Sequence, residues 1–410
     1  MKFFNTDGIR GKALDLICSN IVVKLAQILA EKSKNVVIGY DTRVSSPQIV
    51  DLLINGFVTK GCNVDVIQIA STPMVSYYIK KTKKYNYGIM VTASHNPYYD
   101  NGIKIFNSDG EKIDNLEIEY IKEKFNQDYA FSLMDVLGRV NYFNIDEQYL
   151  AYINSLICFK NQYKIVVDLA NGSLSSIKDK LKLDNIEYVN YLPNGKNIND
   201  QVGACFPENL QRYLIENNAD YGFCFDGDGD RLVMVSKDKI YDGNDLMINF
   251  INYFQCQKSV FTKIANQGAI EYCKKNNKDV LICDVGDSNV VNLMKTHNAD
   301  FGGEESGHFI FKENFYSDSL YSMIKILEII NQGKLIDYHK YYSYSYNLSH
   351  SSSLYQNKQQ LIDLINQMIS KDDYLIIRES GTENKLRFMV QSKDQEVIDR
   401  IKYYFTKMEN

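Results

Sequence analysis

Three aspartates separated by single glycines form the most chemically specific stretch of the sequence, FDGDGDRLVMV, residues 225–235. The carboxylates of Asp226, Asp228 and Asp230 repel one another unless a cation lies among them, and oxygen-only ligands suit Mg²⁺. The glycines let the backbone bend so that the three side chains converge. Lys237 stands where an EF-hand would place its closing glutamate, and apolar runs on both sides oppose a plain acidic surface turn. The loop therefore predicts a magnesium site without naming a reaction.

A serine follows the apolar run YGIMVTA, residues 87–93, which we expect to be a buried strand. Ser94 has His95 beside it, and Lys104 follows across an Asn-Gly turn. A serine can carry a phosphoryl group covalently if a cation steadies the phosphate oxygens. A Ser-His-Asp hydrolase would show G-x-S-x-G, which is absent around Ser94. The competing interpretation is that Ser94 only caps a turn.

Two further polar loops could bind a sugar phosphate. GGEESGH, residues 302–308, places Glu304, Ser306 and His308 on a glycine-punctuated loop. Carboxylates and hydroxyls pair with sugar hydroxyls, and a histidine can move a proton near neutral pH. RESGTEN, residues 378–384, offers groups that could grip a phosphate: Arg378, Ser380, Gly381 and Thr382. Taken alone, each stretch is also consistent with a solvated loop or a capped hairpin.

The elements around these loops repeat one pattern of strand, polar turn and helix. It occurs at 36–53, where a helix opens at Ser46-Pro47, and again at 164–176 and 278–294. Such units make parallel sheets that gather ligands at the carboxyl ends of their strands. The end of the chain differs, because 374–391 predicts a hairpin and 397–405 an amphipathic helix. We therefore expect three related α/β domains and a small α+β domain.

Composition excludes several classes of protein. The chain has 410 residues and a net charge of −5, so its overall charge does not favour binding to nucleic acid or to an anionic membrane. No apolar run approaches the ~18 residues of a membrane span, and the charged N-terminus is no secretory leader. The eight cysteines form no CxxC pair, and most lie in apolar runs. We expect buried, reduced thiols and a cytoplasmic protein.

Taken together and in this order, the motifs resemble the α-D-phosphohexomutase superfamily over essentially the whole chain. The resemblance implies four domains around a central cleft, three of them related mixed α/β domains and the last a smaller α+β domain. We place them at residues 1–140 with the phosphoserine loop, 141–239 with the metal-binding loop, 240–339 with the sugar-binding loop, and 340–410 with the phosphate-binding loop.

The resemblance also implies a role for each candidate residue. Ser94 would be the phosphorylated serine, and Asp226, Asp228 and Asp230 would hold Mg²⁺ together with its phosphate. Glu304 and Ser306 would bind sugar hydroxyls. The group that would hold the phosphate not being transferred is Arg378, Ser380, Gly381 and Thr382. Three residues match acid–base and charge-stabilising positions, and a fourth would lie near the transferring group: Arg10, Lys104, His308 and Arg231.

The implied reaction interconverts a hexose 6-phosphate and 1-phosphate through a phosphoserine and a 1,6-bisphosphate, which also serves as activator. ASHNPYYDNGIKIF (93–106) and PNGKNIND (193–200) are most similar to bacterial phosphoglucosamine mutases, which supply amino-sugar precursors of the cell wall. This similarity also suggests a homodimer. Glu305 and the segment 311–323 are instead similar to phosphoglucomutases and phosphomannomutases, so those sugars stay open. A non-catalytic sugar-phosphate-binding protein and a metal-dependent phosphohydrolase are the alternatives from other classes.

Overall fold

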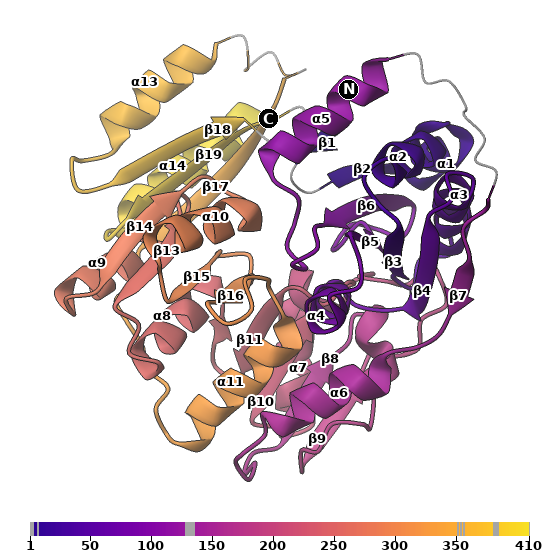
Figure 1. The fold of residues 1–410 in the computed structure, drawn as a ribbon. Coiled ribbons are helices and arrows are strands. Elements are labelled where there is room, and N and C mark those ends of the chain that lie inside the picture. Colours follow the sequence, from indigo (N-terminus) through magenta and orange to yellow (C-terminus); the bar gives the residue numbers. More distant parts are fainter. Residues whose placement is uncertain are drawn as a thin grey trace.

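The chain folds into four consecutive units, each built on its own sheet (Figure 1). The computed structural model describes residues 4–5, 8–127, 136–350, 352, 355, 357–379 and 385–409. Figure 1 shows the units following one another around the molecule, from the first in indigo to the C-terminal unit in yellow. Three units are mixed α/β and the last is smaller, which confirms the predicted fold class.

The first unit contains a seven-stranded sheet in the order β1-β2-β6-β5-β3-β4-β7. The pairs β3–β4, β3–β5 and β4–β7 are parallel, and the pairs at the other edge are antiparallel. The strands are β1 Phe4–Asn5, β2 Gly8–Lys12, β3 Asn35–Tyr40, β4 Asn63–Ile69, β5 Tyr87–Val91, β6 Asp100–Phe106 and β7 Val140–Tyr142. The helices are α1 Ala13–Cys18, α2 Ile21–Ala30, α3 Ser46–Val58, α4 Thr72–Thr82 and α5 Asn115–Asn126.

The second unit contains a five-stranded sheet in the order β12-β11-β10-β8-β9, in which β8 is parallel to both neighbours. Its strands are β8 Ile165–Asp168, β9 Ile186–Val189, β10 Tyr221–Phe225, β11 Leu232–Ser236 and β12 Ile240–Tyr241. Its helices are α6 Asp146–Ser155, the 3₁₀ segments η1 Ser173–Ile177 and η2 Gly203–Cys205, and α7 Pro207–Glu216. The metal loop is the tight connection between the antiparallel strands β10 and β11.

The third unit contains a four-stranded sheet in the order β14-β13-β15-β16. Its strands are β13 Lys258–Thr262, β14 Asp279–Cys283, β15 Phe301–Gly303 and β16 Phe309–Phe311. Its helices are α8 Gly243–Tyr253, α9 Gln267–Lys275, α10 Asp287–His297 and α11 Ser319–Asn331. The stretch GGEESGH joins β15 to β16, which pair antiparallel.

The C-terminal unit is an antiparallel sheet in the order β17-β19-β18. Its strands are β17 Tyr342–Ser349, β18 Tyr374–Glu379 and β19 Lys385–Ser392, and its helices are α13 Lys358–Met368 and α14 Gln395–Glu409. The predicted hairpin and final helix are confirmed. The predicted domain limits stay predictions, and β7 carries the first sheet to Tyr142, just past the limit at residue 140.

One continuous apolar cluster joins the first three units, with members such as Met74, Phe223 and Phe301. The C-terminal unit has a separate core around Leu348, Phe388 and Ile401. A shared core ties three units into one frame, since core side chains pack at near-crystalline density. The fourth unit is joined to the third by contacts that include buried hydrogen bonds from the side chain of Gln391.

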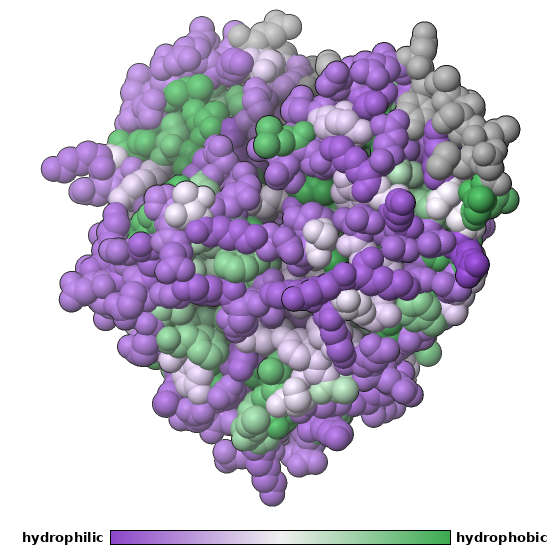
Figure 2. All heavy atoms as spheres, in the orientation of Figure 1, coloured by the Kyte–Doolittle hydropathy of each residue, from purple (hydrophilic) through white to green (hydrophobic). Residues whose placement is uncertain are grey.

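Among the described residues, no helix is long and apolar enough to cross a membrane. Figure 2 shows one face of the molecule as largely hydrophilic, with separate hydrophobic patches. The cysteines form no disulfide bond. The predicted burial is confirmed for Cys62, Cys224, Cys256 and Cys273, and Cys283 is half-buried. The prediction is wrong for three cysteines at or near the ends of helices, which are exposed: Cys18, Cys158 and Cys205.

Candidate active site

Ser94 lies directly against the metal loop. The strand β5 ends at Val91, earlier than predicted, and the chain turns through Thr92 so that Ser94 adopts a left-handed φ of 54°. A left-handed serine costs roughly 1 kcal/mol or more and persists only where surrounding contacts hold it. The fully buried Ser94 donates its hydroxyl to Asp226 Oδ2 at 2.7 Å. The two stretches that the sequence singled out for chemistry therefore meet.

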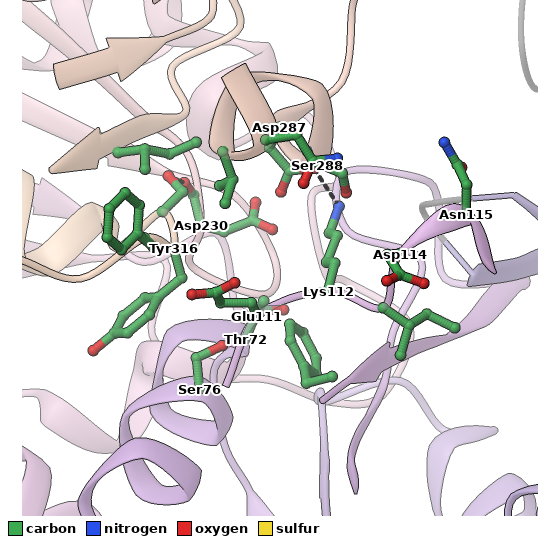
Figure 3. Close-up of a pocket in the computed structure, with 17 residues that line it drawn as sticks. Thr72, Ser76, Glu111, Lys112, Asp114, Asn115, Asp230, Asp287, Ser288 and Tyr316 are labelled. Atoms are coloured by element: carbon green, nitrogen blue, oxygen red, sulfur yellow. Dashed lines mark hydrogen bonds and ion pairs between the residues drawn. The ribbon is translucent and has the colours of Figure 1, made fainter. Parts of the chain in front are cut away.

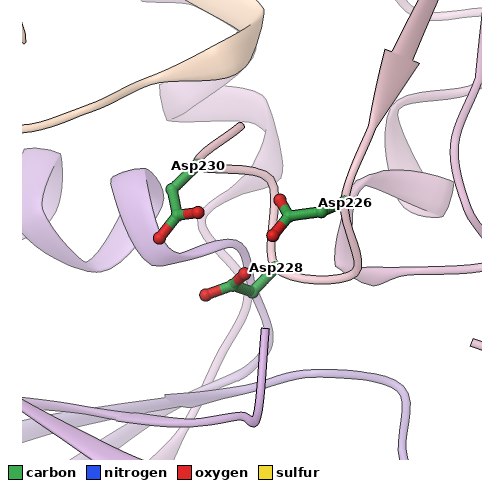
Figure 4. A group of neighbouring side chains, drawn as sticks. All are labelled: Asp226, Asp228 and Asp230. Carbon is green, nitrogen blue, oxygen red and sulfur yellow. The ribbon is translucent and has the colours of Figure 1, made fainter. Parts of the chain in front are cut away.

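The three aspartates converge as predicted (Figure 4). One ligand atom from each carboxylate lies within 4.8 Å of the others, and all three residues are buried. Asp228 Oδ1 is buried and accepts no hydrogen bond from any described residue, and Asp230 Oδ1 has only the ring of His308 beside it, at 3.2 Å. Buried carboxylate oxygens are costly unless paired or bound to a cation. The cluster therefore fits a hard divalent cation.

The side chain of Lys104, on β6, places a positive charge beside two of the three carboxylates. Its Nζ lies 2.5 Å from Asp228 Oδ2 and 2.6 Å from Asp230 Oδ2, and Thr72 at the start of α4 also donates to Asp228 Oδ2. Burial acts to raise the pKa of Asp228, but Lys104 and Thr72 help to bring it below its ordinary value. Burial and the other two aspartates raise the pKa of Asp226 to about 7. Lys104 contacts only the Oδ2 atoms of the two carboxylates, so Asp228 Oδ1 stays without a partner among the described residues.

Replacing Lys104 with methionine is expected to destabilise the protein by about 3–5 kcal/mol in metal-free buffer, because two buried carboxylates lose their partner. Urea unfolding in EDTA measures the loss. Lys122→Met is the matched control, since its pair with Glu119 is exposed and is worth less than about 1 kcal/mol. A Lys104→Met protein as stable as the control would show that the ammonium is not the counter-charge of this loop.

His308 bridges the metal loop and the predicted sugar loop. Its Nε2 lies 3.2 Å from Asp230 Oδ1, and its Nδ1 lies 3.1 Å from Glu304 Oε2 and 3.0 Å from Ser306 Oγ. Burial acts to lower the pKa of His308, but the two carboxylates raise it to about 10. Glu304 Oε1 accepts a hydrogen bond from Gly286 N at 2.8 Å, which fixes the carboxylate. The two carboxylates therefore favour the protonated form of His308.

Three more predicted residues lie near Ser94. Arg231 donates its backbone N–H to Asp226 Oδ1 at 3.2 Å. The charges of Arg231 and Arg10, together with burial, lower the pKa of His95 to about 3, so this histidine is neutral. The Nε atoms of both arginines are buried and make no hydrogen bond to described residues. Two arginines with free donors beside a buried serine are suited to holding a phosphoryl group.

Among the four candidate phosphate-binding residues, Arg378 is the one that the structure describes. It is the next-to-last residue of β18 and acts electrostatically on Glu305 and Glu304 of the sugar loop. Burial and repulsion from Asp242 raise the pKa of Glu305 to about 7, and Arg378 acts in the opposite direction. The other three candidates lie outside the described residues: Ser380, Gly381 and Thr382.

Sequence reasoning missed the residues that hold the Ser94 turn. Arg43 and Asp41 pair at 2.8 Å with no exposed side-chain surface, and Arg43 donates to backbone carbonyls of the Ser94 turn. Asn199, from the second unit, donates to the same turn. Asp41 and Arg43 directly follow the buried strand β3. That charged pair at a strand end was the one local signal available.

A cavity of about 40 Å³ lies behind the metal loop, between the first and third units (Figure 3). It shares Thr72 and Asp230 with the cluster, and an ion pair of 2.6 Å between Lys112 and Asp287 lies at its wall. Ligand sites for small molecules are about 300–1,000 Å³. The cavity is too small for a sugar phosphate and has room for water.

The sequence matches three profiles of the phosphoglucomutase/phosphomannomutase family: alpha/beta/alpha domain I over residues 1–131, alpha/beta/alpha domain III over 242–344, and the C-terminal domain over 364–407. It is 32% identical to a phosphoglucosamine mutase from Nautilia profundicola over 443 aligned residues, covering 99% of both chains. The three profiles leave residues 132–241 unmatched, where the aspartate triad lies, and the relative from Nautilia profundicola covers almost the whole sequence.

Solved structures share the fold. A phosphoglucomutase/phosphomannomutase family protein from Burkholderia thailandensis aligns with a TM-score of 0.78 at 22% identity, covering 99% of this chain and 96% of that one. An N-acetylphosphoglucosamine mutase from Aspergillus fumigatus, solved with GlcNAc-6P and magnesium, aligns with a TM-score of 0.66 at 17% identity, covering 97% and 93%. At these identities the similarity concerns the fold.

Proposed function

The chain belongs to the phosphoglucomutase/phosphomannomutase family of phosphohexomutases, and on that premise we propose that it interconverts glucosamine 6-phosphate and glucosamine 1-phosphate through a phosphate carried on Ser94. The observation that carries the proposal is the contact of 2.7 Å between Ser94 Oγ and Asp226, inside a buried carboxylate triad. A serine needs such a neighbourhood only if a strongly anionic group and its counter-cation occupy it.

The residues of the site suit phosphoryl transfer. The reaction depends mainly on in-line positioning and neutralisation of charge. Asp226, Asp228 and Asp230 would hold Mg²⁺, which when bound neutralises phosphate oxygens and makes the phosphorus more electrophilic. Arg10 and Arg231 offer free N–H donors to the same oxygens. His308, whose pKa the two carboxylates raise, adds positive charge on the side of the sugar loop.

The catalytic cycle has two transfers. The Ser94 Oγ–P bond breaks as a bond forms from phosphorus to the free hydroxyl oxygen of the hexose phosphate. The proton of that hydroxyl leaves to solvent, and Ser94 Oγ takes up a proton to become a hydroxyl again. The resulting 1,6-bisphosphate then presents its other phosphate, which returns to Ser94. One site must therefore hold either end of the sugar, a task that we assign to Arg378 with Ser380, Gly381 and Thr382. The separate core of the C-terminal unit suits such an adaptable clamp.

The amino sugar is the favoured substrate because the relative that covers 99% of the chain carries the name phosphoglucosamine mutase. Glu305 does not oppose this choice, since a carboxylate in the sugar loop could pair with a 2-ammonium group. The second candidate is a glucose or mannose phosphate, because Glu305 and the segment 311–323 are similar to the corresponding parts of phosphoglucomutases and phosphomannomutases. Comparing kcat/KM for glucosamine 6-phosphate, glucose 1-phosphate and mannose 1-phosphate, each with its 1,6-bisphosphate, decides between them.

The pH dependence of the two candidate reactions should differ, because the pKa of Glu305 is raised to about 7. Below that pH the carboxyl is neutral, and above it the anion can pair with an ammonium. The ratio of kcat/KM for glucosamine 6-phosphate over glucose 6-phosphate should therefore rise from about pH 6 to about pH 7, above which the 2-ammonium begins to lose its own proton, as an α-amino group does. Comparing two 6-phosphates cancels the titration of the phosphate, which both substrates share.

Glu305→Gln should flatten that rise and lower kcat/KM for the amino sugar about 10-fold, as expected for loss of a hydrogen bond to a charged group. Its kcat/KM for glucose 1-phosphate should change by less than about 3-fold. Glu216→Gln, an exposed residue on α7, is the matched control. An equal loss with both sugars would contradict a specific contact between Glu305 and the 2-ammonium.

Three further properties are proposed from the family resemblance. The hexose 1,6-bisphosphate would act as activator by restoring the phosphate on Ser94. The protein would form a homodimer, for which sedimentation at several concentrations is the direct test. It would act in the cytoplasm on small sugar phosphates, without nucleic acid or membrane as partner.

A further inference from the structure

Two side chains from different units donate to the same two backbone carbonyls of the Ser94 turn. Arg43 Nη2, in the first unit, lies 2.9 Å from Ser94 O and 2.8 Å from Asn96 O. Asn199 Nδ2, in the second unit, lies 2.8 Å from Ser94 O and 3.4 Å from Asn96 O. The first and the second unit therefore both donate hydrogen bonds to the turn that carries the candidate phosphoserine.

Asn199 also packs against the metal loop. A Cβ atom added to Gly227, between Asp226 and Asp228, would lie only 2.7 Å from Asn199 Nδ2. Asn199 has a left-handed φ of 57°, is buried, and donates its own backbone N–H to Ala170 O at 3.0 Å. Its amide thus fills the space between the Ser94 turn and the backbone of the aspartate loop.

Other hydrogen bonds hold the side chain of Arg43 in place. Asp41 Oδ2 accepts from Arg43 Nε at 2.8 Å and from Thr92 Oγ1 at 2.7 Å. Thr92 Oγ1 in turn accepts from Ser94 N at 2.9 Å. Arg43 Nη1 donates to Asp100 O at 3.0 Å and to Pro97 O, further along the same loop. Neither Arg43 nor Asp41 exposes any side-chain surface to solvent.

We propose that Asn199 and Arg43 are positioning residues, a clamp that sets Ser94 Oγ against the aspartate triad for phosphoryl transfer. The inference rests on the proposed function. It gives a physical role to Asn199 of the PNGKNIND motif, 193–200, which the similarity to the family alone does not supply. The strained φ of Ser94 needs contacts that hold it, and these two donors supply them. Misplacement of a reacting atom by about 1 Å can cost about 100-fold in rate.

Asn199→Gly isolates the clamp, because glycine accepts the left-handed backbone while removing the amide. Asn277→Gly is the matched control: Asn277 has the same left-handed conformation (φ 54°), is exposed, and lies on a turn of the third unit. Arg43→Lys is the second variant, since lysine keeps the charge and loses the planar fork. Each variant is studied as the full chain.

The first measurement is hydrogen exchange of the unphosphorylated protein, which is independent of any activity. The amides of Ser94 and Asn96, bonded to Thr92 Oγ1 and Ala93 O, should exchange at least about 10-fold faster in Asn199→Gly than in Asn277→Gly. Unchanged exchange would overturn the clamp, whatever the enzyme does.

The second measurement is the rate at which glucosamine 1,6-bisphosphate phosphorylates Ser94, followed by quenched-flow intact mass. We expect about 100-fold slower transfer in Asn199→Gly and in Arg43→Lys, with KM for the monophosphate within about 3-fold of the parent value. A parent-like transfer rate, or a rise in KM alone, would overturn the positioning role. If the parent protein itself never takes phosphate on Ser94, the proposed function fails, and the exchange result still decides whether the clamp exists.

Discussion

Ser94→Ala is expected to lower kcat for the mutase reaction by about 10⁴-fold or more, since the variant has no oxygen to carry the phosphoryl group between the two ends of the sugar. The remaining donors and carboxylates can still bind the sugar phosphate, so the affinity for glucosamine 6-phosphate should change little. A coupled assay for the 1-phosphate gives kcat, and isothermal titration gives the affinity.

The fold should survive this change, because alanine replaces a fully buried side chain of nearly the same size. Ser108→Ala, in the exposed turn after β6, controls for the loss of a serine hydroxyl. Turnover by Ser94→Ala at even about 1% of the parent rate would mean that another group carries the phosphate.

Asp228→Asn is expected to lower kcat by about 10²–10⁴-fold, the range that corresponds to several kcal/mol of lost charge stabilisation by a metal. The substitution removes one of the three carboxylate charges, and it presents an N–H₂ either to Lys104 or to the metal position. Calorimetry should show weaker binding of Mg²⁺, and raising Mg²⁺ should recover part of the activity.

Asp238→Asn is the matched control, because Asp238 lies in the exposed β11–β12 turn of the same unit. The far-ultraviolet circular dichroism of both variants should match that of the parent protein. Parent-like turnover and Mg²⁺ affinity in Asp228→Asn would remove this carboxylate from the metal site.

The aspartate triad could be predicted because its signal is local. Carboxylates interleaved with glycines and bounded by apolar runs have few other uses, and the structure buries all three side chains together. The strand–turn–helix repeats were predicted for the same reason, from periodicity over short windows. At 36–58 and 279–297 the elements formed as expected.

The second repeat was predicted less well. After β8 the chain forms only the 3₁₀ segment η1, Ser173–Ile177. The hydroxyls of Ser173 and Ser175 donate hydrogen bonds to the carbonyls of Gly227 and Gly172, respectively. Such side-chain hydrogen bonds to the backbone compete with regular helix formation. The hydroxyl of Ser173 reaches the metal loop, so a long-range contact decided the local structure.

The partners of Ser94 could not be predicted from spacing. Arg43 and Asn199 lie far from Ser94 in the sequence, and although Asn199 belongs to the PNGKNIND motif, nothing in that motif indicates a contact with Ser94. The hydroxyl of Thr72, at the start of α4, donates to Asp228 across the boundary between two units. Sequence patterns predicted the candidate reacting groups, whereas the groups that orient them depend on how the units pack.

The most direct test of a phosphoserine mutase is a chase of labelled phosphate. The protein is first phosphorylated with ³²P-labelled glucosamine 1,6-bisphosphate, and the labelled protein is then mixed with unlabelled glucosamine 6-phosphate in the presence of Mg²⁺. We predict that the label lies on the peptide containing Ser94 and leaves for the sugar at least as fast as kcat. Label that is absent from Ser94 in active protein, or that leaves more slowly than turnover, would contradict the central claim.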